Sequence, residues 1–419
     1  MNNRFKPQSE FSQNVLTLMT GSTLSQAIPI AVSPILTRLY KPEDFGLYAI
    51  FVAIITIIGT IISGRYELAI LLPERDEDAI NIFALGILIT LIMTSLTMIA
   101  VIVFNENIIF WLDNQALKNW LYLVPASIFL AGCHNLLIYF NNRYKQYKAL
   151  TTSYILKSSS SACIQLLIGY IKQGPAGLIS GQLFSRFVVD VQLSIIIIKK
   201  KNILSKITLM KIKEVAKRYK DFPKYSVLAI LANKMSYQLI NIIISTVYSI
   251  GTLGLYSHVQ RVLGLPSSLI SASLGRVFFY EANKEKQRTG KAIKTLKATM
   301  KKLVLIGVPI FGILFITVEN LFAFIFGEPW RLAGVYAQIV IPFFFVQFVV
   351  SALTSIEAIM EKQNIDLLFN ILLLFISIIV IFFSLSFSFK IFLINWTISM
   401  VAIYSIYAYV LIRMAMGKI

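Results

Sequence analysis

Twelve apolar runs of membrane-crossing length divide the 419-residue chain, and they constrain its fold more than any other feature. A helix needs about 20 largely apolar residues to cross a bilayer. The charged share of 14% lies well below the roughly 25% that is usual in soluble domains, so an ordinary soluble protein is excluded. We predict an all-α integral membrane protein with spans at residues 14 to 38, 45 to 64, 79 to 104, 119 to 140, 149 to 171, 175 to 198, 225 to 249, 252 to 275, 303 to 326, 332 to 356, 365 to 387 and 391 to 412.

A basic interval from Lys199 to Lys224 separates two halves that hold six predicted spans each. It contains ten of the 39 Lys and Arg residues, against Glu214 and Asp221 as its acids. Short basic loops stay in the cytoplasm. We therefore predict an N-terminal six-helix lobe at 1–198, a cytoplasmic linker at 199–224 and a C-terminal six-helix lobe at 225–419. Two such bundles meet around a central cavity in many transporters, although no clear sequence repeat relates these halves.

A short amphipathic helix is expected inside this linker. Its apolar residues, Ile212, Val215, Ala216 and Tyr219, recur at helical spacing. Basic residues occupy the rest of the helical wheel. Such a helix is typical of the inner membrane surface, where its cations lie near anionic headgroups. A solvated linker helix that touches no lipid is the alternative.

The charges between spans predict the orientation of the chain. If the N-terminus is inside, 29 of the 39 basic residues fall in inside segments, six fall outside and four lie within spans. This asymmetry predicts that both termini are cytoplasmic.

Two local patterns predict details of helix geometry. The segment GLISG at Gly177 to Gly181 matches the GxxxG pattern and indicates close packing between helices. Pro266 lies within the predicted span 252 to 275, where it removes a backbone hydrogen bond and is expected to bend the helix.

Several functional classes are disfavoured. No outside loop exceeds about 15 residues on these boundaries, which leaves no room for the external catalytic domain of a membrane glycosyltransferase or polymerase. The sequence has no Gly-rich phosphate loop, HExxH motif or nucleophile elbow, and Cys133 and Cys163 lack metal-ligand spacing. The net charge of +19 is confined to short segments that cannot hold a nucleic-acid-binding module. We expect no enzyme activity, cofactor, metal or nucleic-acid partner.

Five charged side chains lie in predicted spans away from the span ends, namely Lys157, Arg186, Asp190, Lys234 and Arg261, whereas Arg38, Glu319 and Asp366 lie near the ends of theirs. A charge at the bilayer centre costs upward of about 2.5 kcal/mol, so retained charges usually face a cavity or a partner. Four cations against one carboxylate favour an anionic cargo, because Arg binds phosphate oxygens bidentately and Lys acts as a point charge. Two alternatives stay open: Arg186 and Asp190 pair with each other, and Lys157 extends to the inner surface.

Five stretches resemble the Wzx-type polysaccharide flippases of the multidrug/oligosaccharidyl-lipid/polysaccharide (MOP) exporter superfamily. They are RLYKPEDFGLYAIF from Arg38, RYELAILLPERDEDAINI from Arg65, RYKDFPKYSVLAILANKMSYQL from Arg218, GLYSHVQRVLGLPSSLISASLGRVFF from Gly254 and FGEPWRLAGVYAQI from Phe326. They cover both halves of the chain.

This resemblance implies twelve transmembrane helices in two six-helix lobes around a cavity that opens alternately to either side. The implied cargo is an undecaprenyl-pyrophosphate-linked oligosaccharide, flipped from the cytoplasmic to the periplasmic face of a bacterial inner membrane for O-antigen, lipopolysaccharide or other surface polysaccharide assembly. We expect contact with membrane lipids and with the polysaccharide polymerase and chain-length machinery. Cations that hold the pyrophosphate are expected among Arg38, Arg65, Lys157, Arg186, Lys234 and Arg261, and Asp190 is the candidate for ion coupling.

The sequence also permits other functions. Within transporters, the alternatives are a flippase for another polyprenyl-linked glycan and a drug or cation antiporter of the same superfamily. An antiporter for cationic drugs relies on buried carboxylates, which are scarce here. A membrane glycosyltransferase or polymerase and a non-transporting assembly scaffold are the alternatives from other classes.

Overall fold

The computed structural model describes the backbone of residues 10–172, 174–199, 204–384 and 386–418. Side chains are described over the same ranges except at 10–19, 196, 229, 236, 272, 273, 276, 363, 364 and 367. The described chain is helical and divides into two compact units, Met1–Lys234 and Met235–Ile419. The N-terminal cations Arg4 and Lys6 lie outside the described residues.

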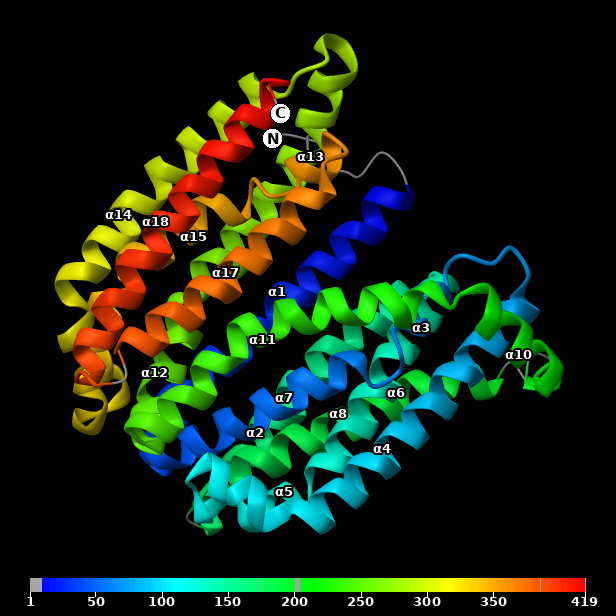
Figure 1. Ribbon diagram of the computed structural model, residues 1–419, viewed down its shortest axis with the longest axis horizontal. Coiled ribbons are helices and arrows are strands. Elements are labelled where there is room, and N and C mark those ends of the chain that lie inside the picture. The colour runs from blue at the N-terminus through cyan, green and yellow to red at the C-terminus, as the bar shows by residue number, and fades with distance from the viewer. Residues whose placement is uncertain (1–9, 173, 200–203, 385, 419) are drawn as a thin grey trace, which may run out of the picture. The chain divides into compact units, whose positions relative to one another are not determined.

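Unit 1 is built from long helices joined by short turns (Figure 1). Its helices are α1 (Glu10–Leu39), α2 (Pro42–Ile61), α3 (Tyr66–Ala69), α4 (Asp76–Leu112), α5 (Lys118–Leu121), α6 (Val124–Arg143), α7 (Tyr147–Ile171), α8 (Ala176–Lys199) and α10 (Leu209–Arg218), with short helices η1 (Gln115–Leu117) and η2 (Phe222–Ser226). Helix α11 (Val227–Ile243) follows and crosses the boundary between the units. Within the unit, α7 packs along α1 and α8, and α6 packs against α2, α4 and α8.

Unit 2 continues with helices of similar length. They are η3 (Ile244–Tyr248), α12 (Ile250–Leu263), η4 (Ser267–Ser271), α13 (Ala272–Thr289), α14 (Ile293–Phe326), η5 (Glu328–Trp330), α15 (Arg331–Ser351), α16 (Ile356–Ile359), α17 (Gln363–Ser384) and α18 (Phe389–Ala415). Helix α15 lies at the centre of the unit, where it packs against α12, α14 and α18, and α17 packs against α18.

The chain is a multi-pass integral membrane protein. Seven helices of the described part are long and apolar enough to cross a bilayer, or eight if the bent pair over Phe222–Tyr248 is one span. Every predicted span lies mostly on helical residues, but those at 14 to 38, 149 to 171, 252 to 275 and 365 to 387 do not pass as straight apolar spans. Charged and polar residues lower the hydropathy of α7, where Lys157 is followed by four serines.

The predicted span at 252 to 275 is wrong as one continuous helix. Helix α12 ends at Leu263, a turn follows at Gly264, and the π-helix η4 then leads directly into α13 at Ala272. Pro266 lies between this turn and η4, and its ring cannot supply the N–H that an uninterrupted α-helix needs. The predicted bend therefore marks the boundary between two helices.

The glycines of the GLISG segment permit the close approach of helices that their spacing predicts. A Cβ atom added at Gly177 would overlap the Tyr40 hydroxyl oxygen, and one at Gly181 would lie 3.0 Å from the Ser161 carbonyl oxygen on α7. Because neither site has room for a methyl group, α8 depends on both glycines to pack against its neighbours.

The predicted linker helix is present as α10, but its apolar face contacts protein. Val215 and Tyr219 are buried in a hydrophobic cluster with Tyr66 and Ile80, and the Tyr66 hydroxyl donates a hydrogen bond to the Ala216 carbonyl oxygen at 3.2 Å. These apolar residues therefore pack against other parts of unit 1, and contact of the linker cations with the membrane surface stays a prediction.

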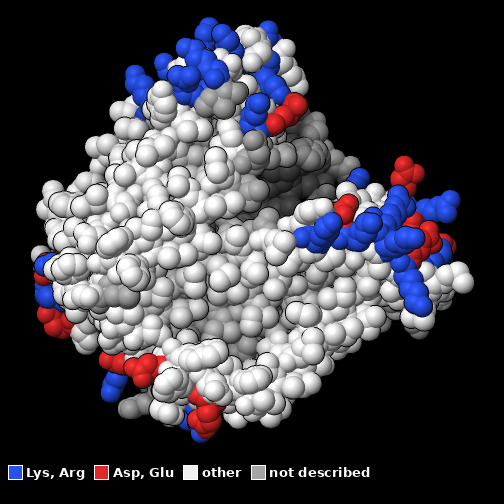
Figure 2. Space-filling view, viewed as in Figure 1, with Lys and Arg blue, Asp and Glu red and all other residues white. Residues whose placement is uncertain are grey.

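Ion pairs at the start of α4 hold this linker in place. The Glu77 carboxylate accepts hydrogen bonds from the ammonium groups of Lys206, at 3.0 Å, and of Lys211. Asn81 adds bonds to the linker backbone at Lys206 and Thr208. Figure 2 shows Lys and Arg gathered over α10 and the nearby start of α4, while the long sides of the helices carry other residues.

Candidate functional site

Four ionisable side chains converge inside unit 1. His134 lies on α6, Lys157 on α7, and Arg186 and Asp190 one turn apart on α8. Since α8 packs against both other helices, residues of its inner face lie next to theirs. The charges of Lys157, Arg186 and Asp190 interact, and His134 interacts electrostatically with all three. We name these four residues the unit 1 cluster.

Asp190 is paired with a histidine rather than with the arginine on its own helix. The His134 Nδ1 atom lies 2.8 Å from the Asp190 Oδ1 atom, and Asp190 is only 6% exposed. Among the described residues, no ion pair within 4 Å joins Arg186 to Asp190, so the direct pairing that their spacing suggested is wrong, and their charges interact only at longer range. The second carboxylate oxygen of Asp190 has no hydrogen-bond partner within the described part of the chain.

Lys157 and Arg186 give the unit 1 cluster an excess of positive charge. Both side chains are half-buried. Arg186 donates one long hydrogen bond, 3.5 Å from its Nη1 atom to the Ser127 carbonyl oxygen, and its buried Nε atom has no partner among the described residues. A guanidinium group has five N–H donors, so Arg186 retains the capacity to bind an acceptor such as phosphate. With two cations against one carboxylate, the cluster is suited to an anion.

Polar residues of α2 and α8 extend the unit 1 cluster. The Tyr48 hydroxyl donates to the Gln182 Oε1 atom at 3.3 Å, and the same phenol interacts electrostatically with Arg186. Gln182 precedes Arg186 by four residues and therefore occupies the same face of α8. These groups supply uncharged donors and acceptors beside the cations.

The other predicted site cations have different surroundings. Arg65 follows α2 with a left-handed backbone conformation (φ 63°), and its Nη1 atom is 3.0 Å from the buried Glu67 carboxylate. Ser63 donates to the second oxygen of Glu67 at 2.6 Å. Arg38 is exposed and donates to the Pro34 carbonyl oxygen at 2.7 Å. The local bonds of Arg65 stabilise the turn between α2 and α3.

Lys234 and Arg261 are half-buried on α11 and α12. Lys234 is the last residue of unit 1, and Arg261 belongs to unit 2. Their participation in a common anion site with the unit 1 cluster stays a prediction.

Sequence reasoning missed His134, Tyr48 and Gln182. His134 could have been identified from the sequence, because it is an ionisable residue inside the predicted span 119 to 140. Lys157 and Arg186 were selected on the same ground. Tyr48 and Gln182 had none, since polar uncharged residues are common in spans and their contact joins positions 134 apart. In the part of the chain that the structure describes, no group of three His, Cys, Asp or Glu residues is placed to hold a metal ion.

Comparison with known proteins finds a family whose sequence model matches the chain and solved structures with a similar fold. Residues 35–335 match the model of a family described as polysaccharide biosynthesis protein. No curated protein matches the chain significantly.

Three solved structures illustrate the similarity of fold. An inward-facing multidrug resistance MATE family transporter of the MOP superfamily is 12% identical, with a TM-score of 0.63 over 96% of each chain. A MOP superfamily transporter from Pyrococcus furiosus Vc1 (DSM3638) is 12% identical, with a TM-score of 0.60 over 97% of this chain and 96% of that one. A MATE transporter of Vibrio cholerae is 10% identical, with a TM-score of 0.59 over 97% and 96%.

At such low identities these structures concern the fold alone, whereas the family match covers well over half of the sequence. The chain therefore belongs to the polysaccharide biosynthesis protein family, and it has the fold of the MOP-superfamily transporters.

Proposed function

We propose that this protein is a Wzx-type flippase that moves undecaprenyl-pyrophosphate-linked oligosaccharide units from the cytoplasmic to the periplasmic face of a bacterial inner membrane. The family match supports a role in polysaccharide assembly, and the fold is one that transporters use. The product would be O-antigen or another surface polysaccharide, handed on to the polymerase and chain-length machinery. No bond of the cargo is made or broken in this step.

The observation that carries the proposal is the positive excess of the unit 1 cluster. Transfer of a diphosphate through hydrocarbon without compensation is prohibitive. Lys157 and Arg186 supply two cations inside a membrane unit, and Arg186 keeps unpartnered donor capacity in the described structure. Arg and phosphate form strong bidentate hydrogen bonds. The pyrophosphate of the cargo therefore fits this cluster.

The remaining predicted features complete the proposed mechanism. Six helices in each of the lobes 1–198 and 225–419, joined by the linker 199–224, would rock so that the cavity opens to each side in turn. Both termini would be cytoplasmic. Cations outside the unit 1 cluster would guide the anion during this movement, and they are Arg38, Arg65, Lys234 and Arg261. Asp190, held by His134, is the candidate for coupling transport to an ion.

Turnover in proteoliposomes tests this function. A labelled undecaprenyl-pyrophosphate oligosaccharide is incorporated, and its exposure to an external sugar-cleaving hydrolase is followed. We expect the wild-type protein to expose the labelled oligosaccharide to the hydrolase. The rate of exposure should fall at least tenfold in a Lys157→Gln/Arg186→Gln double variant, and a Lys234→Ala/Arg261→Ala double variant should abolish exposure. Lys148→Gln is the matched control, because Lys148 is an exposed lysine on the same helix as Lys157. Wild-type rates in both double variants would refute the role of the cations.

A cation antiporter is the second candidate, because Asp190 is a buried carboxylate and two of the similar structures are MATE transporters. The binding pocket of the Pyrococcus furiosus transporter has reverse polarity, which suggests a different function for that protein. Here the cationic excess favours an anionic cargo over a cationic drug. Efflux of a cationic dye by the purified protein, with no exposure of the lipid-linked glycan, would establish the antiporter instead.

A further inference from the structure

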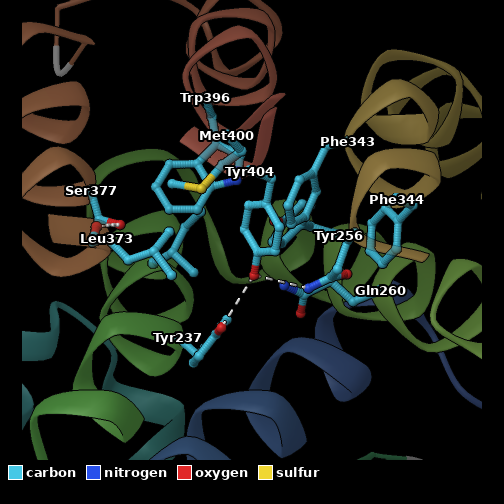
Figure 3. A pocket seen from close by; sticks show the side chains of 12 residues that line it. Tyr237, Tyr256, Gln260, Phe343, Phe344, Leu373, Ser377, Trp396, Met400 and Tyr404 are labelled. Carbon is cyan, nitrogen blue, oxygen red and sulfur yellow. Dashed lines mark hydrogen bonds between the residues drawn. The ribbon is translucent and has the colours of Figure 1, made fainter. Parts of the chain in front are cut away.

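A pocket lined by uncharged side chains lies within unit 2, distant in sequence from the unit 1 cluster. Its volume is about 140 Å³, and its lining comes from five helices, α11, α12, α15, α17 and α18 (Figure 3). None of the twelve described side chains that line it is charged. The lining therefore offers no positive charge to compensate a phosphate group, and its chemistry differs from that of the unit 1 cluster.

The pocket wall combines aromatic faces with groups that both donate and accept hydrogen bonds. The hydroxyls of Tyr237 and Tyr404 lie 3.3 Å apart and point toward one another in Figure 3, and the Gln347 amide donates to the Tyr404 hydroxyl at 3.5 Å. These distances are long for hydrogen bonds, so the groups are only weakly engaged with each other. Gln260 adds a second amide to the lining.

Trp396 contributes a polar group that has no partner. The side chain lines the pocket and is only 6% exposed, yet its indole N–H donates to no acceptor among the described residues. A buried tryptophan N–H usually has a partner, because burial without a hydrogen bond is costly. An acceptor on a bound ligand would satisfy it.

We propose that this pocket binds one neutral pyranose ring of the cargo glycan, an inference that rests on the proposed function. A sugar ring presents C–H faces that pack against aromatic rings and hydroxyls that donate and accept along its edge. Such contacts need no charge, and tyrosine hydroxyls and glutamine amides supply both donors and acceptors. A cavity of about 150 Å³ accommodates a benzene ring, so this pocket of about 140 Å³ has room for the ring atoms of one pyranose, with its outer hydroxyl groups extending through the open side.

An isoprenoid chain is the competing occupant. It would fill the pocket with methylene and methyl groups and leave the Trp396 N–H without a partner, at a desolvation cost. The concentration of hydrogen-bonding groups in a pocket of membrane helices therefore favours the sugar over the lipid tail.

Binding of simple glycosides to the full chain in nanodiscs tests the proposal. The probes are neutral methyl hexopyranosides and methyl N-acetylhexosaminides, detected by saturation transfer from the protein to ring protons. At least one is expected to bind, with affinity at least tenfold weaker in Tyr404→Phe and in Trp396→Phe, which remove a hydroxyl and an N–H. Tyr409→Phe is the matched control, because Tyr409 is exposed on the same helix, α18. Thermal unfolding shows whether each variant is folded. If either Tyr404→Phe or Trp396→Phe fails to fold, the glycoside affinity of the other variant tests the proposal.

Binding of inorganic pyrophosphate, measured on the same samples, separates this proposal from the proposed function. If pyrophosphate binds through Lys157 but no glycoside binds, the pocket proposal is overturned and the flippase stands. If a glycoside binds through Tyr404 but pyrophosphate does not bind, the pocket stands and the flippase mechanism fails. If farnesol displaces the glycoside, and if the Tyr404→Phe substitution weakens farnesol binding as much as glycoside binding, the pocket would be assigned to an isoprenoid and the sugar assignment would be overturned.

Discussion

Two substitutions in the unit 1 cluster should change pyrophosphate affinity in opposite directions. Lys157→Gln removes one of two cations, and Asp190→Asn removes the single carboxylate that opposes them. Asparagine has the shape of aspartate and retains an oxygen that can bond to His134, which lies 2.8 Å from Asp190. The pair of variants therefore isolates charge from packing.

The expected magnitudes follow from the positions of the charges. A phosphate charge about 6 Å from the Lys157 ammonium gains roughly 2.8 kcal/mol at an effective dielectric constant near 20. A net charge-assisted hydrogen bond contributes about 1.5–3 kcal/mol, so we expect Lys157→Gln to weaken binding by about 2 kcal/mol, or roughly 30-fold. For a phosphate charge about 10 Å from the Asp190 carboxylate, the repulsion is at most about 1.7 kcal/mol at the same dielectric constant. Asp190→Asn should tighten binding about fivefold.

Titration calorimetry of inorganic pyrophosphate with the protein in nanodiscs at pH 7 measures both effects. Lys148→Gln again serves as the control and should leave affinity within twofold of wild type. Increased salt should reduce the difference between variants only modestly, because buried charges are poorly screened. Equal weakening by Lys157→Gln and Asp190→Asn would refute the reasoning, since it would mean that the cluster acts through its packing and not through its charge.

Three further predictions concern the stability of the fold. Gly177→Ala should destabilise unit 1 by about 1–3 kcal/mol through overpacking, seen as a lower Tm, whereas Gly312→Ala has open space around it and should not lower the Tm. Val215→Asp places a charge in the buried face of α10 and should release the helix, seen as faster proteolysis within the linker at unchanged membrane insertion. The hydrogen bond from Lys286 holds the pKa of Glu361 below its usual value. Because the pKa of Glu361 is lower in the folded than in the unfolded protein, its ion pair with Lys286 stabilises the fold above the ordinary carboxyl pKa, and this stabilisation is lost as the pH falls through the folded pKa. The Tm difference between wild type and Glu361→Gln should therefore vanish in acid.

Local sequence signals predicted the helices because membrane helices are specified locally. An apolar run of sufficient length and the nearby prolines and glycines set where each helix lies, and the break at Pro266 was visible as a proline in a predicted span. The close approach at Gly177 and Gly181 was likewise predicted from their spacing.

Long-range partners were not predictable in the same way. His134 and Asp190 are 56 residues apart, so no local pattern relates them, and the helical spacing of Arg186 and Asp190 favoured the wrong pair. The packing of the linker helix was not predictable for a similar reason: its apolar face suits lipid and protein equally, and only the tertiary structure shows Val215 in a cluster with Tyr66 and Ile80. The unit 2 pocket draws its lining from five helices, and although Tyr237, Tyr256 and Gln260 lie in the stretches that carry the family resemblance, no local pattern shows that they meet residues of α15, α17 and α18.

Under the two proposals, the candidate sites would divide recognition of the cargo by chemistry. Because a diphosphate carries no information about the sugars attached to it, cations such as Lys157 and Arg186 would recognise the carrier without distinguishing one sugar from another. Discrimination requires hydrogen-bonding groups that reject a ring with a misplaced hydroxyl, since an unmatched buried polar group costs more than a lost apolar contact. Gln260 and Gln347 are such groups. Gln260→Leu should therefore change which glycosides bind while leaving pyrophosphate affinity unchanged in calorimetry, and a parallel loss of both would show that unit 2 does not select the sugar.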